Sequence, residues 1–476
     1  MGRWCGSTAS PLAAPRQAAP STNGATVNRP LVATPSQRRR VRLAAAICGG
    51  WLVLAFGASP ARAAVVHCGD TVTHDTTLSN DVTNCPANGI NIGADGIVVN
   101  LNGHTISQAA DAEQSTGTGG VHFNGHNHVT VRNGYVRGFF NAGVYIDGSD
   151  NTIQRVTSVQ NGVGVAIFGD RNRINDSRQD QNGTGISTAG AAHNTISYDR
   201  ATNNETGMQL DANFSNSSNT ISYSTISGNS GDGIFLFSES NDTISHNTLD
   251  SNGGSGINDF LAYGTTIVAN TASRNTTGFS FADCFDPQPL TGCSGPELIR
   301  NNQALRNKYG FAAGLFFTGT FTGNRAHLNS HAGFRFRGSN VTLLNNIAGS
   351  VSSQSGATEG NGIGIDVGVG QTDDPEFFGT LAELRGNSAN SNKGGPDGLG
   401  DGILVRDDLS SVTITGSTTN FNAGDGINVP NGNATLTSNR ANRNRRYGIE
   451  APGSADGGGN SAFGNLLGQC IGVACS

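Results

Sequence analysis

Glycine recurs through most of this chain at intervals of mostly 21 to 26 residues, and each of these glycines opens the same short apolar pattern. The first and third positions after the glycine are apolar, whereas the second and fourth vary, as at 143–147 and 402–406. This alternation is typical of a β-strand with one buried face. The fourteen glycines that open the pattern are Gly120, Gly143, Gly164, Gly185, Gly207, Gly233, Gly256, Gly278, Gly310, Gly333, Gly362, Gly402, Gly426 and Gly448.

Asparagine marks two further positions of the repeat. An Asn-x-Ile sequence, first seen at Asn151, predicts a second strand in many units. Another asparagine stands three or four residues before the next glycine. At a recurring turn, this residue can take left-handed backbone and bond its amide to the adjacent coil. These turn residues are Asn161, Asn182, Asn204, Asn229, Asn252, Asn275, Asn307, Asn329, Asn422 and Asn444.

Together, these patterns predict an all-β chain folded as a right-handed parallel β-helix, a solenoid of about fourteen coils. The 68 glycines suit a chain in which turns recur. Leucine-rich repeats have a similar length but require a Leu-x-x-Leu-x-Leu frame, which is absent. A propeller requires longer units with four strands. Neither alternative fits this chain.

The sequence from Gly96 to Ile106, together with the repeated glycine and Asn-x-Ile patterns, resembles bacterial β-helix repeat proteins of the pectate-lyase-like superfamily. Relatives include mannuronan epimerases and nitrous-oxide-reductase accessory β-helix proteins. The resemblance covers roughly residues 68–450. It implies the fold but not the activity, because this scaffold hosts lyases, hydrolases, epimerases and non-enzymes. The Gly-His-Gly, Asp-Pro-His-Asp and Arg-x-Pro-x-x-Arg motifs of the enzymes are absent.

The first 63 residues differ from the repeats. Residues 1–37 are rich in Pro, Ala, Ser and Thr, and a run of arginines precedes an apolar stretch at 43–56 and small residues at 61–63. This order predicts a secretory signal, and the apolar stretch is shorter than a membrane span. We therefore expect a disordered lead with a signal at 1–63, a cap with the first strands at 64–119, repeats at 120–450 and a C-terminal cap at 451–476.

Charge and cysteine content agree with export. Removing residues 1–63 leaves 21 basic and 35 acidic residues, a net charge of −14, which argues against general nucleic-acid binding. Sequence alone permits fifteen pairings of the six remaining cysteines. A stiff solenoid keeps distant cysteines apart, so we expect local disulfides, which suit an oxidising compartment. The predicted pairs are Cys68 with Cys85, Cys284 with Cys293, and Cys470 with Cys475.

Outward positions of the first strand define the candidate binding residues. Aromatic residues in the early and middle coils are candidates for stacking on sugar rings, or they lie beneath a neighbouring loop. Charged residues take over in later coils, and Arg337, Asp366 and Arg406 are expected to share one column. That column forms either a salt-bridge ladder or the floor of a binding site. The aromatic candidates are Tyr145, Phe168, Phe235, Phe237 and Phe260.

Insertions favour a binding site near this column. The longest coils open at 278, 333 and 362, and their extra residues are expected to flank the first-strand face. In repeat proteins, insertions gathered on one face often build the binding face. Arg335, Arg337 and Arg406 are candidates to neutralise a sugar carboxylate, and His331 is the nearest candidate base. On the insertion after 362, the candidates to contact the substrate, as acids or through a bound metal, are Asp373, Asp374 and Glu376.

Two patterns raise the question of a metal. Gly-Asp-Gly at 231–233, 400–402 and 424–426 contains carboxylates that suit Ca²⁺, although Asp-Gly is also ordinary turn chemistry. His122, His126 and His128 cluster in the first repeat with a spacing that would allow a transition-metal site, but a solvated surface cluster is the preferred interpretation. We therefore assign no cofactor and no metal ligands from the sequence, and Ca²⁺ is the candidate cofactor.

These features lead to two hypotheses. The first is a secreted protein that binds an acidic polysaccharide or cell-surface glycan and cleaves or epimerises it, as a lyase, epimerase or glycoside hydrolase. The second is a non-catalytic β-helix that serves as a surface adhesin or accessory binding module. Both hypotheses expect no nucleic-acid partner and no membrane span in the mature chain.

Overall fold

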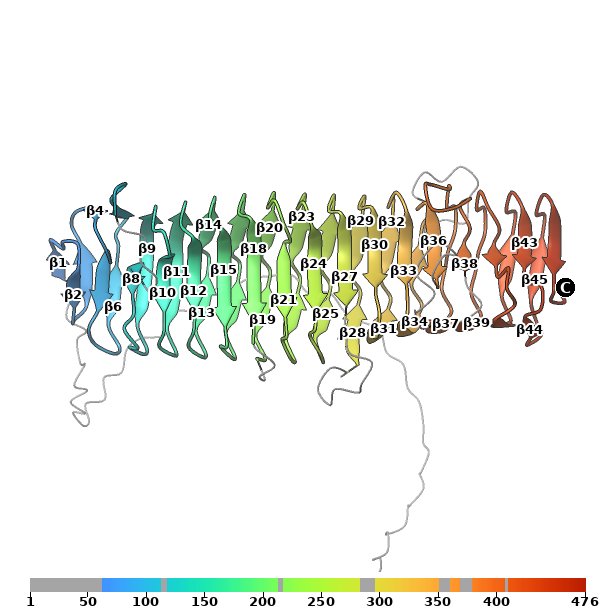
Figure 1. Cartoon of the computed structure of the whole chain (residues 1–476), viewed down its shortest axis with the longest axis horizontal. Coiled ribbons are helices and arrows are strands. Elements are labelled where there is room, and N and C mark those ends of the chain that lie inside the picture. The colour runs from blue at the N-terminus through green and yellow to red at the C-terminus, as the bar shows by residue number, and fades with distance from the viewer. Residues whose placement is uncertain are drawn as a thin grey trace, which may run out of the picture. The chain divides into compact units, whose positions relative to one another are not determined.

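The computed structural model describes residues 62–112, 118–212, 217–282, 296–350, 360–368, 379–406 and 410–476. These residues form parallel strands stacked as a right-handed β-solenoid of about 16 turns, with no helix among them (Figure 1). The predicted β-helix is therefore confirmed. The turn number exceeds fourteen because end strands such as β2 (Asp70–Val72) join the same stack without the glycine pattern.

One ladder, called here the first-strand sheet, contains the strand that each pattern-opening glycine begins. All of its pairings are parallel, and successive members come from successive coils. After β2, its strands are β5 (Ile90–Ile92), β8 (Gly119–His122), β10 (Ala142–Ile146), β12 (Val163–Ile167), β15 (Thr184–Ala189), β18 (Thr206–Asp211), β21 (Ile234–Phe237), β24 (Ser255–Phe260), β27 (Thr277–Ala282), β30 (Tyr309–Ala313), β33 (Ala332–Phe336), β36 (Ile363–Val367), β38 (Ile403–Val405), β40 (Ile427–Asn428), β43 (Tyr447–Glu450) and β46 (Gly468–Ile471).

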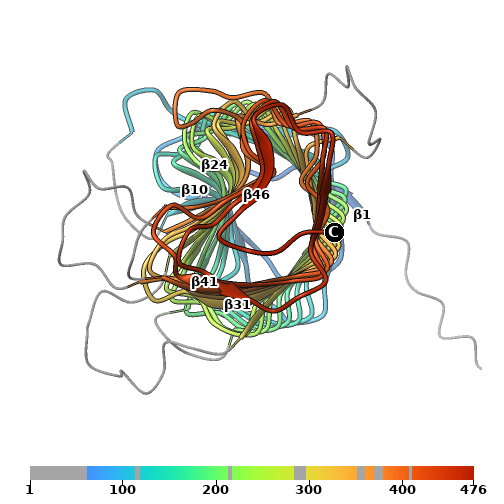
Figure 2. The same ribbon diagram turned by 90° about the vertical axis from the view of Figure 1, so that its right-hand side faces the viewer.

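Each coil then contributes to a second sheet, which closes the tube seen along its axis in Figure 2. In one coil, β13 (Arg173–Asn175) and β14 (Arg178–Asp180) are separated by a corner at Asp176, whose φ is 53°. They pair with β16 (Thr195–Ser197) and β17 (Arg200–Thr202) of the next coil. Inward isoleucines at the Asn-x-Ile positions stack fully buried between coils, which forms a continuous core.

The predicted asparagine ladder runs through the interior at the corner before the first strand. The Asn307 backbone N–H donates to Asn329 Oδ1 at 3.0 Å, and its side-chain Nδ2 donates to the same oxygen at 3.2 Å. The left-handed residue is the one before the asparagine, as at Gln160 with φ of 57°, because the asparagine itself turns inward. The ladder comprises the ten predicted residues and also Asn361, Asn392 and Asn465.

The ladder also explains why glycine opens each first strand. A Cβ added at Gly310 would lie 2.3 Å from the carbonyl oxygen of Gly333 and 3.0 Å from Asn329 Nδ2. No side chain fits between these two neighbours. Glycine is therefore required by the close approach of consecutive coils.

One coil differs from the predicted register. Gly364, three residues after the ladder residue Asn361, occupies the place expected for Gly362. Ile363 consequently pairs with Ala332 and lies in a small outer cluster instead of the main core. The other residues predicted to point inward are buried in the main core: Val144, Ile146, Val165, Ile167, Phe334, Phe336 and Ile365.

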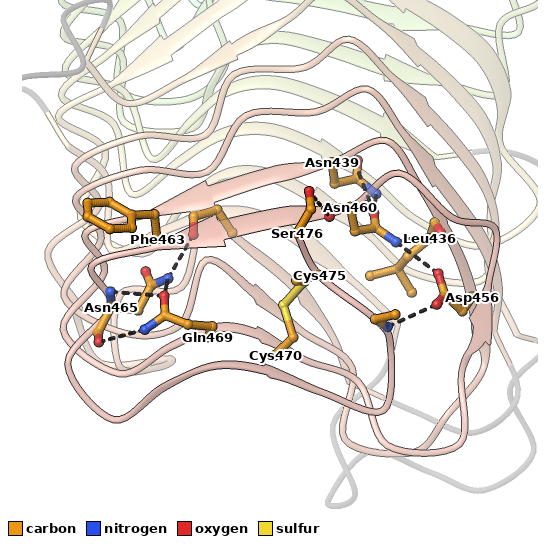
Figure 3. Close-up of a disulfide and its surroundings, with 12 residues drawn as sticks. Leu436, Asn439, Asp456, Asn460, Phe463, Asn465, Gln469, Cys470, Cys475 and Ser476 are labelled. Atoms are coloured by element: carbon orange, nitrogen blue, oxygen red, sulfur yellow. Dashed lines mark hydrogen bonds between the residues drawn. A yellow bond between two sulfur atoms is a disulfide. The ribbon is translucent and has the colours of Figure 1, made fainter.

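Disulfides link Cys68 to Cys85 and Cys470 to Cys475, which confirms two of the three predicted local pairs. The predicted pair Cys284–Cys293 lies outside the described residues. At the C-terminal end, the second bridge holds the segment that leads to Ser476, whose backbone N–H donates to the Asn460 carbonyl (Figure 3).

Among the described residues, no helix has the length and apolar character needed to cross a membrane.

Candidate functional site

The predicted charged column divides into two columns. Arg335 on β33 lies opposite Asp366 on β36, and Asp366 lies opposite Leu404 on β38. Arg337 and Arg406 each lie just beyond the ends of these strands, on either side of Gly368. The expectation that Arg337, Asp366 and Arg406 share a column is therefore wrong. Its cause is the two-residue shift at Gly364, which moves Asp366 from the fourth position of its strand to the second.

Asp366 and Arg406 form an ion pair between neighbouring coils. Arg406 Nε lies 2.5 Å from Asp366 Oδ1, and the Asp366 side chain is only 1% exposed. Burial raises the pKa of Asp366 despite the opposing attraction of Arg406. Burial also lowers the pKa of Arg406, but the carboxylates of Asp366, Asp397 and Asp401 together outweigh this effect and the net shift is upward. Arg406 also donates through Nη2 to the Asp397 carbonyl at 2.8 Å.

Tyr309 lies beside this ion pair at the start of β30. Its hydroxyl donates to Asp397 Oδ2 at 3.1 Å, and the Arg335 guanidinium lies 4.5 Å from its ring centre. Burial raises the pKa of Tyr309, and the Asp397 carboxylate also raises it while Arg335 opposes the shift. The phenol therefore stays protonated at neutral pH and can serve as a proton donor.

His331 contacts the same tyrosine. Its ring packs edge-on against Tyr309 with centroids 5.1 Å apart, and Nδ1 lies 3.0 Å from Ser330 Oγ. Within the described part of the chain, Nε2 has no partner. Burial lowers the pKa of His331, and Lys308 and Arg335 add to this effect against Asp397. The imidazole is therefore neutral at neutral pH, as a general base requires.

The set of Tyr309, His331, Arg335, Asp366, Asp397 and Arg406 is called here the charged cluster. It brings together four of the five predicted catalytic residues, while Arg337 lies at its edge, close enough to influence Asp366. Sequence reasoning missed Tyr309 and Asp397. The insertion around 393–401 indicated the right segment, but nothing in the pattern connected Asp397 to a tyrosine 88 residues earlier. The predicted acidic residues Asp373, Asp374 and Glu376 lie outside the described residues.

The predicted aromatic residues lie on the same sheet in earlier coils. They form two groups, in which the ring centres of Tyr145 and Phe168 are 4.9 Å apart and those of Phe237 and Phe260 are 5.9 Å apart. Phe235 belongs to the second group through its contact with Phe237. Phe260 is two coils from β30, so these rings are not part of the charged cluster.

The candidate metal ligands have other contacts. His126 Nδ1 lies 2.8 Å from Asp95, and His122 packs against Tyr145. In the Gly-Asp-Gly turns, Asp232 accepts the Ser255 N–H and Asp401 accepts the Asp425 N–H. Across the described ranges, no three His, Cys, Asp or Glu residues group in a way that could hold a metal ion.

A family model agrees with this architecture. The family model for the right-handed β-helix region matches two overlapping segments, residues 119–272 and 215–348. No curated protein sequence matches the chain. The family match and the parallel stack of coils agree on the fold, a right-handed parallel β-helix.

Three solved structures that match this chain have low sequence identity and low TM-scores. The A-module of mannuronan C-5 epimerase AlgE4 from Azotobacter vinelandii is 15% identical, covering 59% of this chain and 84% of that chain, with a TM-score of 0.33. A double mutant of the periplasmic alginate epimerase AlgG is 13% identical over 72% and 76%, with a TM-score of 0.38. Pectate lyase Pel9A is 13% identical over 74% and 78%, with a TM-score of 0.30.

Proposed function

We propose that the charged cluster binds an acidic polysaccharide and acts on it at a uronate residue. The observation on which this proposal rests is the state of Arg335. Its guanidinium is held over the Tyr309 ring, and it forms no ion pair within the described part of the chain, whereas Arg406 is bound to Asp366. Arg335 is therefore the guanidinium in the cluster that is available to bind a carboxylate, for which its planar fork is suited.

The neighbouring groups suit proton transfer at the carbon next to that carboxylate. Arg335 would neutralise the uronate, which makes the C5 proton more acidic. His331 Nε2 would accept that proton, and the Tyr309 hydroxyl would protonate the departing C4 oxygen as the C4–O bond breaks and a C4–C5 double bond forms. Return of a proton to C5 from the tyrosine side would instead give epimerisation. The fixed contacts of Tyr309 with Asp397 and Arg335 support this assignment.

A non-catalytic binding module is the second candidate. The absence from the sequence of the motifs known in β-helix enzymes favours it. In that case, the same Arg335 binds the carboxylate, and His331 and Tyr309 only line the site.

We also propose that the protein acts outside the reducing cytosol. The two disulfides support this proposal, because such bonds persist in oxidising compartments. The predicted secretory signal lies outside the described residues.

Turnover assays on pectate, alginate and glycosaminoglycans distinguish the two candidates, with new double bonds followed by ultraviolet absorbance and C5 inversion by NMR. For an enzyme, His331→Ala is expected to abolish turnover but preserve binding, and Arg335→Ala is expected to weaken binding about tenfold or more. Arg300→Ala, at an exposed arginine of another strand, is the matched control. Binding without turnover on every polymer would favour the module, and binding unaffected by Arg335→Ala would overturn the assignment of the site.

A further inference from the structure

A hollow lies near the C-terminal end, on strands that do not belong to the first-strand sheet. It has a volume of about 490 Å³ and lies over β42 (Arg440–Asn442) and β45 (Ser461–Phe463). Its lining includes Asn420, Phe421, Arg440, Asn442, Arg443 and Phe463, and the hollow is called here the C-terminal pocket. None of these residues takes part in the charged cluster.

The base of the pocket is fixed by an outer asparagine ladder. Asn420 Oδ1 accepts the Asn442 backbone N–H at 2.8 Å, and Asn442 Oδ1 accepts the Phe463 backbone N–H at 2.9 Å. Both side-chain oxygens are therefore engaged, and the amide NH₂ groups make no hydrogen bond to other described residues. The pocket thus contains amide donors in fixed positions.

The far wall is held by the C-terminal disulfide. Ser476 also lines the pocket, and its backbone N–H donates to the Asn460 carbonyl at 3.0 Å. The Cys470–Cys475 bridge ties this short segment back onto β46, as Figure 3 shows. The disulfide and this hydrogen bond therefore fix the position of the pocket wall that Ser476 forms.

The charge of the pocket is opposite to that of the chain. Two arginines line it, no Asp or Glu side chain does, and neither arginine forms an ion pair within the described ranges. The whole chain has a net charge of −6. Two unpaired guanidinium groups favour an anionic ligand, and the planar fork of arginine matches both carboxylate and phosphate groups.

Aromatic rings add a second element of recognition. The Arg443 guanidinium lies 5.5 Å from the Phe421 ring centre, which holds it in place over that ring. Phe463 is 72% exposed at the rim, so its ring face is open to a ligand. In the pocket, aromatic rings therefore lie beside guanidinium and amide donors. This arrangement matches a sugar ring that has apolar faces and a carboxylate at its edge.

We propose that the C-terminal pocket is a second glycan-binding site, which takes one uronate residue of an acidic polysaccharide. Phe463 covers a face of the sugar, Arg440 and Arg443 bind its carboxylate, and the asparagine amides donate to its hydroxyls. The sugar class rests on the proposed function, but the site itself does not. A protein with two such sites can hold one polymer while the charged cluster acts on another stretch.

Calorimetric titration of the full chain with short oligogalacturonate and oligomannuronate tests this site. Two binding events per chain are expected for the wild type. Arg443→Ala combined with Phe463→Ala should remove one event, Arg335→Ala should remove the other, and all three together should remove both. Arg445→Ala, at an exposed arginine of the same coil outside the pocket, is the matched control and should keep both events.

The outcomes separate the two proposals. A single wild-type event that only Arg335→Ala removes would overturn the pocket and leave the proposed function standing. A single wild-type event that only the pocket variant removes would support the pocket and overturn the proposed function of the charged cluster. Equal binding of a neutral oligosaccharide of the same length, or binding of a nucleoside monophosphate in place of the uronates, would overturn the ligand class. Thermal melting of each variant checks folding, since all the substituted side chains of the pocket are at the surface.

Discussion

The carboxylate of Asp366 and the guanidinium of Arg406 lie 2.5 Å apart, although 39 residues separate them in the sequence. The coil between them is lengthened, yet β36 and β38 still pair in register and bring the two side chains together. Arg406 also donates a hydrogen bond to the Asp397 backbone carbonyl, and the Asp397 carboxylate accepts one from the Tyr309 hydroxyl. The ion pair therefore holds the insertion against the strands that contain Tyr309 and Arg335.

Replacement of Asp366 by Ala is expected to lower the free energy of unfolding by about 3 kcal/mol, because Arg406 would keep its partly buried charge without a carboxylate partner. Removing both charges, as Asp366→Asn with Arg406→Met, should restore much of this loss. Urea denaturation of the single and double variants measures the coupling. If the double variant lost as much unfolding free energy as the single variants do together, the two side chains would not be coupled.

Asp199 is expected to make stability depend on pH. It is fully buried, and burial, assisted by Asp176, raises its pKa to about 8. The folded chain retains a proton that the unfolded chain releases near pH 4. The stabilising contribution of Asp199 is therefore present below about pH 4 and falls as the pH rises towards 8.

Asp199→Asn should remove this dependence. Later coils already have asparagine at the equivalent corner, where Asn247 accepts the Ser224 N–H and donates to the Ile221 carbonyl. We expect the variant to be more stable at pH 8 by at least about 1 kcal/mol and nearly unchanged at pH 4. Melting curves at the two pH values test this, with exposed Glu205→Gln as the control; an equal gain at both would contradict the buried-proton explanation.

Gly310→Ala should destabilise the stack by about 2 kcal/mol or more, since its Cβ would lie 2.3 Å from the Gly333 carbonyl oxygen. Gly314, in the turn after β30, offers a matched control because the nearest atom to an added Cβ is 3.7 Å away. Gly314→Ala is expected to melt close to the wild type. If the two variants had the same melting temperature, the close approach of Gly310 to Gly333 would not explain why position 310 is a glycine.

Cys475→Ser should weaken the C-terminal pocket while leaving the charged cluster intact. Without the bridge to Cys470, the segment leading to Ser476 loses its covalent link to β46, and one wall of the pocket becomes mobile. We expect a severalfold loss of uronate affinity at the pocket event alone, measured by calorimetry. An unchanged pocket affinity would show that Ser476 contributes nothing to binding.

Much of this architecture follows from local sequence alone. Each coil repeats one short pattern, and stacking identical units is the way in which such a unit buries its apolar face. The fold, the inward residues and the asparagine ladder could therefore be predicted from glycine and asparagine positions. The same stiffness keeps distant cysteines apart, which made the pairs Cys68–Cys85 and Cys470–Cys475 predictable.

Tertiary structure alone decided the register at Gly362 and Gly364, and with it the charged cluster. Both glycines begin an acceptable apolar alternation, so local pattern cannot choose between them. The choice is made by the ladder hydrogen bonds of Asn361, which accepts the Asn329 N–H and donates its own N–H to Asn392 Oδ1, so that the strand opens at Gly364. The contact of Tyr309 with Asp397 likewise depends on how an insertion folds back over the strands, which no repeat encodes.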